Sequence, residues 1–201
     1  MNRKFGMYSA ILTFLAVFGF AAFRAIGSDM GSYFTSLFIS WGAVPLVCSF
    51  AAFTKKEDKA AAYTAMAFAA IYGVFIAIVY FAQMTTLQTN LTDQASILLD
   101  YKRFGLFFNY DLLGYGFMAL AFFFVALTLE VRDKGDKWLK ILMLVHGVFW
   151  ITGILLPVLG VFKADMAGGD LIGILVLEFW CIYFMPVCLL SYRYFKKLRT
   201  V

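Results

Sequence analysis

Several ionisable side chains stand out in this chain because they lie inside or beside long apolar segments. Asp111, His146 and Glu178 lie within such segments, whereas Arg24 and Lys163 lie near segment ends. Burying one charged group in a bilayer costs about 2.5–3.5 kcal/mol or more, so such a group normally faces the interior of a helix bundle and has a partner. These residues are therefore the first candidates for a binding site or a proton path.

The depth of each group follows from a helical rise of about 1.5 Å per residue. If both termini are cytoplasmic, as the charge pattern described below indicates, Asp111 lies about 9 Å and Glu178 about 12 Å from the outer surface. Arg24 and Lys163 lie at the outer edge. His146 differs, because it lies about 12 Å from the cytoplasmic surface. All except His146 thus share the outer half of the membrane.

This distribution predicts an outward-facing polar pocket in which Glu178 and Asp111 supply carboxyl groups and Arg24 supplies a counter-charge. Its hydrogen-bonding neighbours at similar depth would be Asn109, Tyr110, Tyr115 and Gln83. A carboxyl group held away from water can carry a proton or bind a cationic substrate. The alternative is structural: Arg24 forms an ion pair with Glu178 or Asp111 and pins two helices together.

His146 is the only histidine, and we interpret it as a hydrogen-bonded core residue or an inner relay for the pocket. A single histidine argues against bis-histidine haem, a histidine-rich zinc site and H-E-x-x-H proteolysis. A metal held by Asp111, His146 and Glu178 would require all three at one depth, but His146 lies too deep to join the two acids. The chain also lacks a Gly-rich phosphate loop, paired CxxC and G-x-S-x-G. We therefore predict no metal and no cofactor, and assign no catalytic residue.

The elements that position these groups are predicted by composition. Hydrophobic residues make up 63% of the 201 positions and charged residues 14%, against about 25% charged in a soluble domain. A spanning helix needs about 20 apolar residues, so the chain has room for short connections only. The prediction is an all-α bundle of six transmembrane helices forming one integral membrane domain over 1–201. The predicted spans are 6–27, 33–53, 60–82, 105–129, 138–162 and 170–192.

Lysines and arginines are concentrated in alternate connections between these spans. The termini and the second and fourth connections hold Arg3, Lys4, Lys55, Lys56, Lys59, Arg132, Lys134, Lys137, Lys140, Arg193, Lys196, Lys197 and Arg199. The other connections hold only Arg24, Lys102, Arg103 and Lys163. The positive-inside rule then predicts that both termini are cytoplasmic, in a plasma (inner) membrane. The net charge of +5 is explained by anionic lipid headgroups, and no nucleic-acid partner is expected.

Local patterns add further detail. Arg3 and Lys4 precede an apolar run longer than a cleaved signal allows, so we interpret it as a retained first helix. The third span has small residues at every fourth position, which favour close helix packing and predict a place inside the bundle rather than at its rim. These residues are Ala61, Ala65, Ala69, Gly73 and Ala77.

The connection over 83–104 is the only long one, and its mixed polarity predicts a short interfacial helix near 92–103. Asn90 begins a glycosylation sequon, which matters only in a eukaryotic secretory pathway. In the fifth span, Gly153 lies one turn before Pro157. Proline removes a helical hydrogen bond and bends helices, so this pair marks the expected bend.

The function these features favour is binding or translocation of a small molecule or ion through the outer pocket. A six-helix unit is small for an alternating-access transporter, so a homodimer or a partner membrane subunit is expected. Two alternatives stay open: an accessory or scaffold subunit without its own substrate, and an intramembrane enzyme acting on lipid or hydrophobic substrates. The enzyme is disfavoured because no nucleophile and base lie at one depth.

Overall fold

Helices account for most of the computed structural model, which describes residues 1–163 and 169–198, and no strand occurs among those residues. The long helices are α1 (Asn2–Ala25), α2 (Asp29–Phe53), α3 (Lys59–Met84), α5 (Leu106–Thr128), α6 (Lys134–His146), α7 (Val148–Val158) and α8 (Gly169–Lys197). The short ones are α4 (Asp93–Leu99) and 3₁₀ turns at Lys56–Asp58, Thr86–Gln88 and Tyr101–Arg103. The all-α prediction is confirmed.

Six stretches are long and apolar enough to cross a bilayer, with α6 and α7 together forming the fifth. This composition indicates an integral membrane protein. Each predicted span corresponds to one of these stretches. Most helices run a few residues past the predicted edges, and α8 continues to Lys197.

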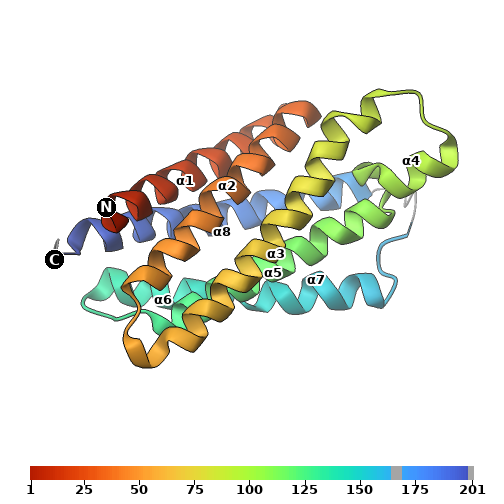
Figure 1. Ribbon diagram of the computed structural model, residues 1–201. Coiled ribbons are helices and arrows are strands. Elements are labelled where there is room, and N and C mark those ends of the chain that lie inside the picture. The colour runs from red at the N-terminus through yellow and green to blue at the C-terminus, as the bar shows by residue number, and fades with distance from the viewer. Residues whose placement is uncertain (164–168, 199–201) are drawn as a thin grey trace.

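Helices that follow one another along the chain pack side by side and form a ring (Figure 1). α1 packs on α2, α2 on α3, α3 on α5, and α5 on α6 and α7, while α8 packs on α1 and α6. One end of the ring, here the basic end, holds both termini and the α2–α3 and α5–α6 connections. The opposite far end holds the α1–α2 turn, α4 and the start of α8. The connections rich in lysine and arginine thus gather at one end.

Glycines at positive φ end two of these helices at the far end. Gly27 (φ 73°) follows α1, and Gly160 (φ 65°) follows α7. After α1, Ser28 N–H bonds to the carbonyl of Phe23 at 2.8 Å, which is the long hydrogen bond of a Schellman motif. Val161 makes the equivalent bond to Leu156 at 3.0 Å. Both turns need a left-handed residue, which glycine adopts without steric cost.

The fifth span is interrupted, but not at the residue pair where we expected a bend. The helix is interrupted at Gly147, between α6 and α7, and continues without a break through Gly153. Pro157 lies in the last turn of α7, where it removes few hydrogen bonds. The interruption of the helix thus lies at Gly147, and the bend expected at Gly153 and Pro157 stays a prediction.

The small residues of α3 form a contact face, as their spacing indicates. Ala65 and Ala69 are buried, and a Cβ on Gly73 would lie 3.3 Å from Val44 of α2. The opposite face of α3 is exposed, with Val74 at 57% and Ile78 at 52%. The expectation that α3 avoids the rim was wrong, because every helix of a ring has an outward face.

Charged side chains tie α8 to the α5–α6 connection at the basic end. Asp136 is 2% exposed and accepts a hydrogen bond from Arg132 N–H at 3.2 Å. Lys197 of α8 pairs with both Asp133 and Asp136, the second at 3.2 Å. The Arg132 guanidinium lies 4.4 Å from the Tyr194 ring centre.

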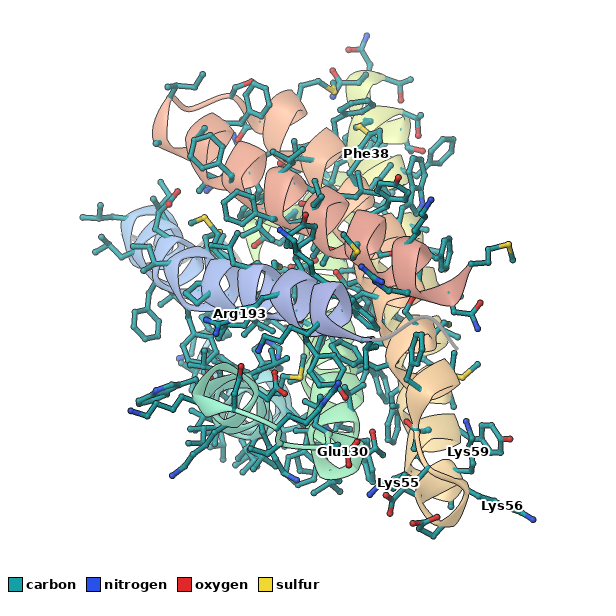
Figure 2. The ribbon with its side chains drawn as sticks, turned by 90° about the vertical axis from the view of Figure 1, so that its left-hand side faces the viewer. Phe38, Lys55, Lys56, Lys59, Glu130 and Arg193 are labelled. Carbon is teal, nitrogen blue, oxygen red and sulfur yellow. The ribbon has the colours of Figure 1, made fainter. Side chains whose placement is uncertain are left out.

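Figure 2 views this end directly and shows α8 with Arg193 beside the α5–α6 connection. It also shows Lys55 next to Glu130, an ion pair of 3.5 Å between the α2–α3 and α5–α6 connections. Both of these side chains are more than half exposed, so this pair adds little to stability. At this end of the bundle we therefore expect the buried carboxylate of Asp136 to contribute most to stability.

The contact with Lys197 predicts a pH dependence at Asp133. The hydrogen bond from Lys197, followed by one from the Asp136 N–H, lowers the pKa of Asp133 to about 2. An acid with a lowered pKa contributes stability above its unfolded pKa and loses it as pH falls toward the folded value. We expect the stability difference between the wild type and Asp133→Asn to be constant above about pH 4 and to vanish near pH 2.

Acid titration of thermal unfolding in both proteins measures this difference. Asparagine is a suitable replacement because it still accepts the N-cap hydrogen bond that Asp133 receives from Asp136 N–H at 3.0 Å. A difference that stays the same down to pH 2 would contradict the contact with Lys197.

Candidate functional site

A cavity of about 340 Å³ lies in the far half of the bundle, between α5, α7 and α8. We call it the main cavity. It lies within the size range of small-molecule sites, roughly 300–1,000 Å³. Its lining comprises Tyr101, Phe104, Phe108, Asp111, Leu112, Tyr115, Gly116, Phe149, Thr152, Gly153, Leu156, Val161, Phe162, Gly173, Val176, Leu177 and Trp180. Among these described residues, Asp111 is the only carboxylic acid, and there is no lysine, arginine or histidine.

Asp111 lies on α5 and is 1% exposed. Its carboxyl group interacts with the Tyr80 hydroxyl of α3, but its Oδ1 atom has no hydrogen-bond partner. No lysine or arginine among the described residues forms an ion pair with it. A buried polar atom normally has a partner, so this oxygen needs an explanation.

Aromatic rings form most of the wall around this carboxyl group. Tyr115 and Trp180 meet edge to face, with ring centres 5.2 Å apart. Phe108 and Phe162 do the same at 5.0 Å. Two glycines let α7 approach α5 here, since a Cβ on Gly153 would lie 2.9 Å from the Leu112 carbonyl oxygen and 3.6 Å from the Cα of Gly116. The site is therefore mainly apolar, with one acid.

A second, more polar cavity of about 220 Å³ adjoins the main cavity at the far end and shares several lining residues with it. We call it the mouth. Arg24, Asp29 and Lys102 line it. Arg24 pairs with Asp29 at 3.3 Å, and Lys102 pairs with the same carboxylate. Among the described residues, the Arg24 guanidinium does not come within 4 Å of the carboxylate of Glu178 or Asp111, so the predicted ion pair does not form. Arg24 pairs with Asp29 instead.

Glu178 lies on α8 outside the lining of either cavity. Its Oε1 atom is buried and has no hydrogen-bond partner. Arg24 of α1 acts on it electrostatically, which places Glu178 at the seam between α1 and α8. Asp111 lines the main cavity and Glu178 does not, so the two acids do not share a pocket among those described.

The polar neighbours predicted for the pocket have separate surroundings. Gln83 holds the long connection: its amide donates to the Leu99 carbonyl at 2.7 Å and accepts from Tyr101 N–H at 3.1 Å. The helix α4 predicted in that connection is confirmed. Tyr115 lines the main cavity, whereas Asn109 and Tyr110 do not. The Asn109 Oδ1 atom is buried without a partner, and Tyr110 packs against other aromatic rings.

His146 lies behind the inner wall of the main cavity and is 1% exposed. Its Nε2 atom accepts a hydrogen bond from the Trp180 indole N–H at 3.2 Å, and its Nδ1 atom has no partner. Phe149 and Phe184 pack on its ring. The described contacts link it to neither Asp111 nor Glu178. They match the core interpretation of this histidine, with Trp180 between it and the cavity.

The sequence could not single out the residues of the aromatic wall or the glycines that shape it. Trp180 is only one of several tryptophans within apolar runs, and hydrophobic patterning does not distinguish it from Trp41, which is 55% exposed. Only Gly153, which lies one turn before a proline, gave a local signal. Gly173, which lines both cavities, gave none.

The arrangement can hold a mostly apolar molecule that presents one hydrogen-bond donor or positive charge to Asp111. No protein-family model, curated protein or solved structure matches this chain.

Proposed function

We propose that this chain is an integral membrane protein that binds or translocates a small molecule through the main cavity, with both termini in the cytoplasm. The unpaired Oδ1 atom of Asp111 is the observation that supports binding. A protein gains little stability from an uncompensated buried carboxyl group, so its presence beside a cavity is better explained by a ligand. The exposed apolar residues that surround the ring are then lipid contacts.

The proposed orientation rests on the basic end. Lys55, Lys56 and Lys59 come together there with the basic C-terminal part of α8, and such residues are concentrated on the cytoplasmic side of membranes. Single cysteines at Thr89 and Lys56, both exposed, test the orientation once the native cysteines are replaced. In intact cells an impermeant thiol reagent should label the Thr89→Cys protein and spare the Lys56→Cys protein. The reverse pattern would invert the topology.

The binding proposal can be tested without knowing the ligand. Replacing Asp111 with leucine removes an unsatisfied carboxyl group, and Tyr80 keeps its hydrogen bond with Ser36. We expect Asp111→Leu to leave thermal stability unchanged or to raise it by about 1–3 kcal/mol, because binding residues are commonly suboptimal for stability.

Asp136→Leu is the matched control, since Asp136 is equally buried but has partners. Thermal unfolding of both variants in the same detergent gives the comparison. If Asp111→Leu is destabilised as strongly as Asp136→Leu, Asp111 is a structural residue. The scaffold alternative then replaces the binding proposal.

A further inference from the structure

We infer that the main cavity recognises a lipophilic amine, a molecule with one protonated amino group and an apolar body, which enters from the bilayer between α7 and α8. This inference rests on the proposed function and names its ligand class. It follows from the charge of the cavity, the state of its polar groups and its route of access.

The charge of the cavity favours a cation. Asp111 supplies the only formal charge among the described lining residues, and no basic side chain offsets it. A carboxylate in an apolar site needs a positive partner and hydrogen-bond donors. Its Oδ1 atom is free, while Tyr80 interacts with the carboxyl group from the other side. An ammonium N–H aimed at Oδ1 would supply both the charge and the donor.

Two of the other polar groups in the wall are already engaged. The Trp180 indole N–H bonds to His146 at 3.2 Å, and the Thr152 hydroxyl bonds to the Phe149 carbonyl at 3.0 Å. Apart from Asp111, the hydroxyl groups of Tyr101 and Tyr115 are the side-chain polar groups that the described wall leaves for a ligand. So few partners disfavour sugars and amino acids, which carry several polar groups. Aromatic faces also attract cations, by about 0.5–2 kcal/mol each. The wall thus suits a single cationic head on an apolar body.

The route of access follows from the packing of α7. This helix packs on α5 and α6 and has no buried residue. α8 instead packs on α1 and α6. Val176 of α8 and Val161, which follows α7, both line the cavity. Their exposed fractions are 57% and 46%. These exposed apolar side chains beside the cavity support an opening on the side between α7 and α8, toward lipid.

The mouth at the far end is a poor entrance for the same ligand. Arg24 and Lys102 both line it, with Asp29 as the single acid between them. This excess of positive charge repels an ammonium group. An amine already dissolved in the bilayer reaches Asp111 sideways without passing these cations.

The experiment uses the full chain in lipid nanodiscs and four ligands with the same eight-carbon tail: octylamine, octyltrimethylammonium, octanol and octanoate. Titration calorimetry against empty nanodiscs gives the dissociation constant of each. We expect octylamine to bind on the order of tenfold more tightly than octanol, and octanoate to bind most weakly. Asp111→Asn should abolish the preference for the amine, whereas Asp29→Asn, the same change at the mouth, should preserve it. Octyltrimethylammonium, which lacks an N–H, should bind less tightly than octylamine.

A cavity-filling variant keeps the test valid if Asp111→Asn does not fold. A Cβ on Gly173 would meet no atom within 4 Å, so a side chain can begin there without a clash at its Cβ. Gly173 lines the cavity, and Gly173→Phe should therefore block octylamine. Equal binding of octanol and octylamine, insensitive to Asp111→Asn, would overturn the amine assignment and leave the proposed binding function intact. Failure of all four ligands to bind the wild type would overturn both.

Discussion

We expect Gly42→Ala to destabilise the bundle by about 1–3 kcal/mol, or more, although it adds only one methyl group. Gly42 lies where α1 and α2 cross. A Cβ there would lie 2.8 Å from the backbone nitrogen of Thr13 and 3.1 Å from its Cα, as well as 2.5 Å from its Oγ1. A side chain could turn aside, but the backbone of α1 cannot, so the two helices must separate.

The separation matters because the contact between α1 and α2 is the most extensive in the bundle. Helices in lipid associate largely through such close packing of small residues, since the surrounding acyl chains are as apolar as their side chains. Thermal unfolding in detergent, followed by circular dichroism, measures the loss. Gly173→Ala is the matched control, because its Cβ meets nothing within 4 Å. Equal unfolding temperatures for the two variants would show that the crossing is looser than described.

The number and position of the long helices could be predicted because each is a run of about 20 apolar residues between polar connections. The short helix α4 was also predictable, since Thr92 is a side-chain N-cap that accepts from Ala95 N–H at 3.3 Å. These features depend on local sequence alone. The outer-half position of Asp111 followed from the same arithmetic, and the structure places it in the far half.

The partners of the charged groups were not predictable, because they depend on how each helix is rotated and on the order of helices in the ring. Depth suggested that Arg24 could reach Glu178 or Asp111. It pairs instead with Asp29, five residues along the chain, across the Gly27 turn. Depth also placed Asp111 and Glu178 together, whereas only Asp111 lines the main cavity. Asp136 was overlooked because the predicted spans put it in a hydrophilic connection, where a carboxylate is expected to be exposed. The structure places it in the first turn of α6, where it is buried.

Asp136→Leu should lower the stability of the folded protein by about 2–4 kcal/mol. Breaking a fully buried ion pair typically costs roughly 3–5 kcal/mol, but Lys197 and Arg132 are about one-third exposed and can turn toward water. The carboxylate of Asp136 accepts from Arg132 N–H at 3.2 Å and pairs with Lys197 at 3.2 Å. Leucine keeps similar bulk but removes both contacts. Chemical denaturation in mixed micelles, compared with the wild type, gives the free-energy difference.

Two further variants separate the charge of Asp136 from its hydrogen bond. Asp136→Asn keeps an acceptor for Arg132 N–H and loses only the charge, so it should fall between the wild type and Asp136→Leu. Asp133→Asn removes the second carboxylate that pairs with Lys197, at an exposed position. It should lower the stability far less, because Asp136 still pairs with that lysine. If the two asparagine variants are equally stable, burial does not distinguish the two acids. The link between α8 and the α5–α6 connection would then depend on packing, through Tyr194 and its neighbours, and not on the buried carboxylate.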